Sequence, residues 1–97
     1  MKIVAVTACP TGIAHTYMAA EQLEKTAKKL GHAIKVETQG AMGIENELSA
    51  ADVAGAAVLI LAVDIAVERE ERFDKIRKIQ VPVQAALKNP EAIFAQI

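Results

Sequence analysis

Two patterns of hydrophobic residues alternate along the chain, short unbroken runs and runs with helical spacing. The unbroken or alternating runs predict four strands, over residues 2–7, 32–39, 57–63 and 76–81. The first and third are β-branched runs with few polar residues, as expected for strands buried on both faces of a parallel sheet. The second alternates polar and apolar residues and should be less buried. The fourth carries charges and ends before Pro82, which suits a sheet edge.

Helical spacing and capping residues predict the helices between these strands. They are expected over residues 15–30, 50–55, 83–87 and 90–96. Gly31 stops the first helix at the usual position after its end. Ser49 with Asp52 approximates a capping box, and Pro90 suits a first helical position. The five consecutive charges of residues 68–72 predict a solvated helix face.

Strand and helix alternate throughout, so the sequence predicts an α/β fold of Rossmann-like type. The expected architecture is a three-layer sandwich, with a four-stranded parallel sheet of order 2-1-3-4 and helices on both faces. The 97 residues suffice for a single domain, residues 1–97, without a linker or repeat. Ligands in such folds bind at the carboxyl ends of the strands.

Composition and charge narrow the classes of function. Hydrophobic residues make up 53% of the chain and aromatic residues only 3%, so the core must be aliphatic. A net charge of -1 gives no basic face for nucleic acid. The longest apolar run, residues 54–63, is about half of the ~20 residues that a membrane span needs. With no signal peptide either, we expect a cytoplasmic protein without direct membrane insertion, and nothing demands more than a monomer.

Cys9 is the only cysteine in the chain. An intrachain disulfide and a CxxC redox pair are therefore excluded, and no Cys/His spacing indicates a metal site, so neither metal nor cofactor is expected. Cys9 follows the first strand and precedes the sequence PTGIAHT and a helix. The positive end of that helix favours both a bound anion and the nucleophilic thiolate. These features predict that Cys9 carries a phosphoryl group.

The segment after Cys9 has the residue types of a phosphate-binding loop. Its predicted members are Pro10, Thr11, Gly12, Ile13, Ala14, His15 and Thr16. Gly12 permits tight curvature, and the hydroxyls of Thr11 and Thr16 are potential donors to phosphate oxygens. We assign His15 a binding role without acid–base function, because the helix dipole disfavours its protonated form.

Two other classes of function are consistent with the same residues. Cysteine phosphatases have a Cys-x5-Arg motif before a helix, and here His15 occupies the arginine position. Histidine cannot grip phosphate in the two-pronged manner of arginine, and Asp64 is the one candidate for the acid that a phosphatase uses. The spacing therefore favours a carrier over a hydrolase. The third class is a non-enzymatic binding module of flavodoxin-like shape, for which Cys9 would be dispensable.

Residues 9–21, CPTGIAHTYMAAE, resemble the active-site signature of the fructose-type IIB components of the bacterial phosphoenolpyruvate-dependent sugar phosphotransferase system. A second motif of that family is similar to residues 36–40 with Gly43 and residues 44–46. Residues 49–64 and 89–91 also fit, so the resemblance covers essentially the whole chain. Residues 68–78 depart from it, being more charged and slightly longer than the family pattern.

The resemblance implies a complete reaction sequence. Cys9 would accept phosphate from a phosphohistidine on a IIA component. It would pass the phosphate to a sugar, fructose by default, bound in the membrane-embedded IIC permease. The chain from Met1 to Ile97 would then be a free IIB subunit that associates peripherally with that permease. From the predicted topology, the residues expected to dock the partners are Gln39, Gly40, Met42, Asp64 and Ile65.

Overall fold

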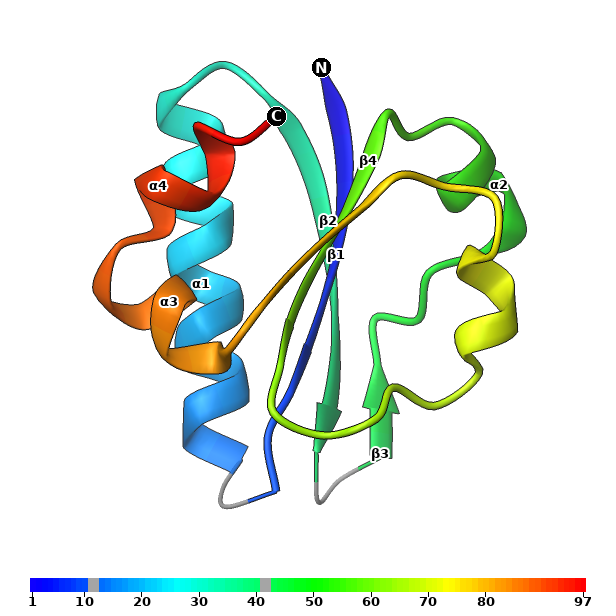
Figure 1. The fold of residues 1–97 in the computed structure, drawn as a ribbon, viewed down its shortest axis with the longest axis horizontal. Coiled ribbons are helices and arrows are strands. Elements are labelled where there is room, and N and C mark those ends of the chain that lie inside the picture. Colours follow the sequence, from blue (N-terminus) through cyan, green and yellow to red (C-terminus); the bar gives the residue numbers. More distant parts are fainter. Residues whose placement is uncertain (11–12, 41–42) are drawn as a thin grey trace.

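A single β-sheet forms the middle layer of the computed structural model, which describes residues 1–10, 13–40 and 43–97. The elements are β1 (Lys2–Ala8), α1 (Ile13–Lys29), β2 (Ala33–Gly40), β3 (Gly43–Glu45), α2 (Ala50–Ala54), β4 (Val58–Val63), the 3₁₀ turn η1 (Glu70–Phe73), β5 (Lys78–Val81), α3 (Val83–Lys88) and α4 (Pro90–Phe94). Helices α1, α3 and α4 cover one face of the sheet, and α2 and η1 cover the other (Figure 1). The predicted α/β sandwich with helices on both faces is confirmed.

The sheet has five strands in the order β3-β2-β1-β4-β5. The four predicted strands are parallel neighbours in the expected order. The predicted count of four is wrong by one, because β3 pairs antiparallel with β2, Gly40 lying opposite Gly43. No element is predicted between residues 39 and 50, and residues 41–42 lie outside the described residues. A strand of three residues is too short to show a period-2 pattern.

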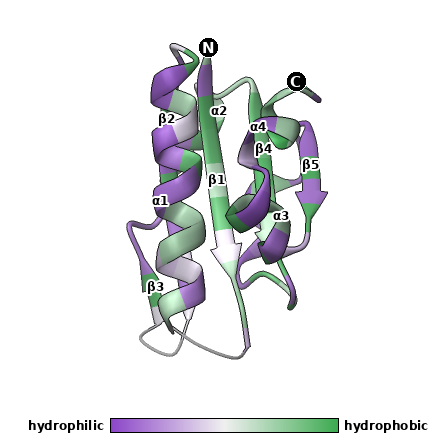
Figure 2. Cartoon of the chain, turned by 90° about the vertical axis from the view of Figure 1, so that its left-hand side faces the viewer, coloured by the Kyte–Doolittle hydropathy of each residue, from purple (hydrophilic) through white to green (hydrophobic). Residues whose placement is uncertain are grey.

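The first strand buries side chains on both faces of the sheet, as its unbroken apolar run predicts. Ile3 packs in a cluster with Leu23 of α1, and Val4 packs in a second cluster with Phe73 of η1. All six residues of β4 are buried as well. Figure 2 shows hydrophobic colour along β1 and β4 and hydrophilic colour along much of α1. Because each fully buried aliphatic side chain contributes about 1.5–3 kcal/mol, these two strands supply much of the driving force for folding.

Local capping chemistry sets the ends of the helices. Gly31, just after α1, has the left-handed φ of 81° that favours glycine. The capping box of α2 is confirmed, since the Asp52 N–H donates to the Ser49 hydroxyl at 3.1 Å and the Ser49 N–H donates to the Asp52 carboxylate at 2.8 Å. Helix α1 begins at Ile13, two residues before the predicted start. None of the helices in the described residues is long and apolar enough to cross a membrane.

The charged run of residues 68–72 forms the predicted solvated face only in part, because residues 68–71 are exposed whereas the Arg72 side chain is turned inward. The chain after β4 runs along the carboxyl edge of the sheet toward β3 before it enters the short turn η1 (Figure 1). From η1 the Arg72 side chain reaches Glu37 on β2, which is fully buried. This crossing segment, residues 64–69, covers the carboxyl half of β2. That half is therefore buried, contrary to the expectation of a less buried strand.

Candidate functional site

Cys9 lies directly after β1, in the middle of the carboxyl edge of the sheet. The preceding residue, Ala8, is in register with Gln39 on β2 and with Val63 on β4. The Ala8 carbonyl accepts a hydrogen bond from the Asp64 N–H at 2.9 Å. Cys9 is 7% exposed and lines two adjoining hollows. The expected position of Cys9, at the edge where such folds bind ligands, is thus confirmed.

The first hollow, of about 330 Å³, lies between α1 and α3. The residues that line it are Cys9, His15, Asp64, Pro82, Val83, Gln84 and Leu87. His15 is exposed on the first turn of α1, so both ends of the Cys-x5-His motif face one space. The Asp64 carboxylate accepts a hydrogen bond from the Val83 N–H at 3.1 Å, at the start of α3. That bond fixes Asp64 as a wall of the hollow and uses one of its acceptor oxygens.

The second hollow, of about 290 Å³, lies between the end of β2 and the segment after β4. The residues that line it are Cys9, Pro10, Gln39, Gly40, Gly43, Ile65, Ala66 and Glu68. Three of the predicted docking residues, Gln39, Gly40 and Ile65, therefore surround Cys9 on this side. Ile65 is 42% exposed at the rim, whereas Gln39 is buried. Met42 lies outside the described residues.

The loop predicted to bind phosphate is described in part. Thr11, Gly12 and the side chain of Ile13 lie outside the described residues. Pro10 and Ala14 are exposed beside His15. Helix α1 begins at Ile13, so the last four residues of the predicted loop are helical. The first N–H groups of a helix generally lack an acceptor within the helix and can bind an anion. With 17 residues, α1 is long enough for its dipole to add partial positive charge there.

Thr16 is part of the framework beneath the loop. It is 1% exposed, and its carbonyl accepts a hydrogen bond from the Thr7 hydroxyl of β1 at 3.1 Å. A β-carbon added at Gly40 would lie 3.5 Å from the Thr16 hydroxyl oxygen. Thr16 thus fills the space where α1, β1 and β2 meet, so its hydroxyl lies beneath the surface on which Pro10 and His15 are exposed.

The side chains around Cys9 carry little positive charge. Among the described residues that line the two hollows there is no Lys or Arg, whereas Asp64 and Glu68 contribute carboxylates. An anion bound to Cys9 would therefore depend on backbone N–H groups and on His15. Such a site lacks the charge-assisted, two-pronged grip that arginine provides.

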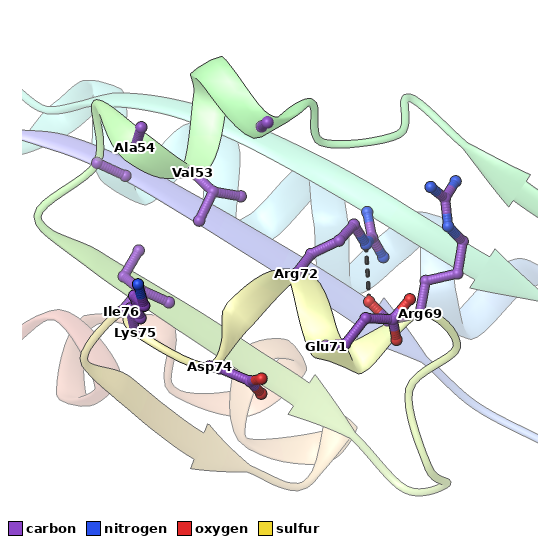
Figure 3. Close-up of a pocket in the computed structure, with 10 residues that line it drawn as sticks. Val53, Ala54, Arg69, Glu71, Arg72, Asp74, Lys75 and Ile76 are labelled. Carbon is purple, nitrogen blue, oxygen red and sulfur yellow. Dashed lines mark hydrogen bonds between the residues drawn. The ribbon is translucent and has the colours of Figure 1, made fainter.

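A larger hollow, of about 600 Å³, lies between α2 and η1 (Figure 3). It shares no lining residue with the two hollows beside Cys9. Apolar side chains such as Val53 and Ile76 form part of its lining, together with charged side chains such as Lys75 and Asp74. Among the described residues that line it there is no cysteine, serine or histidine.

A buried polar cluster that the sequence did not indicate lies beside the second hollow, which Gln39 lines. The Glu37 carboxylate accepts hydrogen bonds from both terminal nitrogens of Arg72, at 2.7 and 3.0 Å. Burial raises the pKa of Glu37, but hydrogen bonds from Arg72, the Leu48 N–H and Gln39 outweigh it, so the pKa is lowered and the group stays charged. The partners lie 35 residues apart, where no spacing rule applies. The one available signal was an acid beside the apolar Val36.

A second polar contact ties the start of α1 to the edge strand β3. The Tyr17 hydroxyl donates a hydrogen bond to the Glu45 carboxylate. This hydrogen bond is the main reason why the pKa of Tyr17 is raised. Because Tyr17 is 41% exposed, the contact forms part of the surface at the Cys9 end of the molecule.

Comparison with known proteins gives one consistent result. The family model described as "PTS system, Lactose/Cellobiose specific IIB subunit" matches residues 4–96. The "PTS system fructose-like EIIB component 2" of Escherichia coli is 54% identical over 96 residues, covering 99% of this chain and 91% of that protein. The "PTS system fructose-specific EIIABC component" of Bacillus subtilis is 52% identical over 93 residues, covering 96% of this chain and 14% of that protein. The crystal structure of a domain of a fructose-specific IIABC component from Borrelia burgdorferi has a TM-score of 0.93 and 50% identity, covering 98% of this chain and 90% of that one.

Proposed function

The chain belongs to the IIB family of the sugar phosphotransferase system, of the fructose-like type, and we propose that it transfers phosphate through Cys9. The observation that carries this proposal is the position of Cys9. It follows the central strand, precedes the N-terminus of a long helix and lines two surface hollows. A nucleophile with an adjacent anion site is what phosphoryl transfer requires.

In the first step, the Cys9 thiolate sulfur attacks the phosphorus of a phosphohistidine on a donor domain. An S–P bond forms as the P–N bond breaks, and the histidine nitrogen leaves with the bonding electron pair. The N–H groups at the start of α1 stabilise the charge on the phosphoryl oxygens. The product is phosphocysteine on this chain and an unphosphorylated donor.

In the second step, a hydroxyl oxygen of the sugar attacks the same phosphorus. The O–P bond forms as the S–P bond breaks, the thiolate leaves, and the hydroxyl proton passes to a base or to water. The acidic residues Asp64 and Glu68, with no arginine beside them in the described lining, keep the phosphoryl group from being held too strongly. That balance suits a carrier, whose bound group must leave again.

The proposed site consists of Cys9 as the nucleophile and a phosphate-binding loop. The loop residues are Pro10, Thr11, Gly12, Ile13, Ala14, His15 and Thr16. Support differs among them, since His15 lines the same hollow as Cys9, whereas the burial of Thr16 favours a framework role. His15 acts as a hydrogen-bond donor to the phosphoryl group, without acid–base function.

The proposed partners are a IIA domain as donor and a IIC permease with bound sugar as acceptor. The Bacillus subtilis relative supports this, because its name joins A, B and C components and its B-like stretch is 14% of its length. We propose that residues 1–97 act as one IIB domain in the cytoplasm, as a monomer beside the permease. Fructose is the proposed sugar, following the names of the fructose-like and fructose-specific relatives.

The test is phosphorylation of fructose by the reconstituted system. Purified chain, a phosphorylated IIA domain and membranes that contain the matching IIC permease are incubated with labelled fructose. We expect sugar phosphate only when the chain is present, and none with Cys9→Ser. Sugar phosphate formed equally well by Cys9→Ser would overturn the proposal. Steady release of phosphate from an aryl phosphate by the chain alone would favour the phosphatase instead.

A further inference from the structure

Every N–H group of the Arg72 guanidinium donates a hydrogen bond within the fold. Its two terminal nitrogens donate to the two oxygens of the Glu37 carboxylate, at 2.7 and 3.0 Å. The same nitrogens also donate to the carbonyls of Leu48 and Glu68, and Nε donates to the carbonyl of Arg69 at 2.8 Å. Figure 3 shows the side chain lying against the η1 turn. Arg72 therefore connects the crossing segment, through the carbonyls of Glu68 and Arg69, to the buried acid Glu37 on β2.

Gln39, at the end of β2, forms hydrogen bonds with the same segment. Its side-chain oxygen accepts a hydrogen bond from the Glu68 N–H at 2.8 Å, and its nitrogen donates to the Glu68 carbonyl at 3.2 Å. The nitrogen also donates to the Glu37 carboxylate at 2.7 Å. The amide of Gln39 thus pairs with the backbone of one residue as a neighbouring strand would, and it is linked directly to the buried ion pair.

The crossing segment forms one wall of the second hollow beside Cys9. Ile65, Ala66 and Glu68 line that hollow opposite Gly40. The next residue, Arg69, has a φ of 58°, a left-handed conformation that costs free energy in a non-glycine residue. The hydrogen bonds to the backbone of Glu68 and Arg69 compensate for that cost and fix where the wall turns away from the sheet.

We infer that Gln39, Glu37 and Arg72 are positioning residues, which hold the wall of residues 65–68 beside Cys9 in the form that the phosphoryl donor recognises. The inference rests on the proposed function, because it concerns how the donor reaches Cys9. A purely stabilising role explains the cluster poorly, since a buried ion pair generally contributes little more stability than apolar residues of the same volume. The hydrogen bonds of the cluster converge on the backbone of the wall, which indicates that the cluster fixes the position of the wall.

The primary test replaces Gln39 with Met, which keeps the length of the side chain and removes its hydrogen bonds. The KM for a phosphorylated IIA domain should rise roughly fivefold or more, the order expected when two hydrogen bonds no longer order the wall. At saturating donor, kcat should stay within about twofold, because the substitution leaves Cys9, His15 and the start of α1 unchanged. Hydrogen exchange of the Glu68 amide should become roughly tenfold faster, since its acceptor has gone.

Two further variants separate positioning from folding. Arg72→Lys keeps the positive charge but cannot form the two-pronged contact, so it should change KM and Glu68 exchange in the same direction as Gln39→Met. Lys35→Met is the matched control, because Lys35 lies on the same strand and makes an exposed ion pair with Asp52. It should leave KM and the exchange of Glu68 unchanged.

The outcomes distinguish this inference from the proposed function. Unchanged KM in Gln39→Met, with or without faster exchange of Glu68, overturns the inference while phosphorylation of the wild-type chain upholds the carrier function. A raised KM with unchanged exchange also overturns it, because Gln39 would then act on the donor directly. A wild-type chain that accepts no phosphate overturns both.

Discussion

Replacing Arg72 with Met should destabilise the fold strongly, because it leaves the Glu37 carboxylate buried without its cationic partner. Glu37 has no exposed side-chain surface, and the Arg72 side chain is only 12% exposed. Removing one member of such a pair typically costs about 3–5 kcal/mol. A domain of this size has a free energy of unfolding of about 5–15 kcal/mol, so the loss is a large fraction of the total.

Urea denaturation followed by far-UV circular dichroism measures this loss. Each kcal/mol lowers the Tm of a domain of this size by roughly 4–8 °C, so thermal unfolding should move down by at least about 12 °C. The double variant Glu37→Gln with Arg72→Met removes both charges and keeps an oxygen for the Leu48 N–H. It should therefore recover a clear part of the lost free energy of unfolding.

The pH dependence provides an internal check on the mechanism. Without Arg72, Glu37 is most costly when it is ionised, so the difference between wild type and Arg72→Met should shrink as the pH falls and Glu37 is protonated. A loss below about 1 kcal/mol at neutral pH would refute the reasoning, since an exposed pair costs no more than that. A double variant with no higher free energy of unfolding than Arg72→Met would also refute the reasoning.

Three smaller predictions concern the end of α1, the cap of α2 and the buried acid Glu37. Gly31→Ala should cost about 1 kcal/mol of unfolding free energy, because the φ of 81° disfavours a β-carbon that otherwise meets nothing within 4 Å; an unchanged Tm would contradict this. Ser49→Ala should lower the urea midpoint by the equivalent of about 1 kcal/mol through loss of the helix cap, and a neutral effect would show that the capping box is idle. The lowered pKa of Glu37 stabilises the fold at pH values above its usual 4.5, and that stability is lost as the pH falls through 4.5 toward the folded-state value; Glu37→Gln should flatten part of this slope in acid titrations.

Most of the fold follows from local sequence signals. The apolar runs of β1 and β4 specify buried strands because a strand covered on both faces has no place for polar side chains. Ser49 with Asp52 and Gly31 locate helix ends through contacts within a few residues. The strand β3 escaped prediction because its three residues form a strand only by pairing with β2.

The environment of Cys9 was predictable in part. The position of Cys9 after a central strand, with His15 in the first turn of a helix, placed both at one hollow. The role of the charged run was not predictable, because Arg72 meets Glu37 only after the chain has crossed the sheet edge. The pattern of charges in residues 68–72 would be the same whether all of these side chains were solvated or one of them reached a buried acid.

Intact mass spectrometry after incubation with a phosphohistidine donor tests the central claim most directly. The chain carries one cysteine, so a single added phosphoryl group that maps to Cys9 and disappears when the phosphate is passed on is the predicted result. The control is Cys9→Ser, which removes the thiolate and changes little else. An adduct that persists in Cys9→Ser, or no adduct on the wild-type chain with an active donor, would contradict the account.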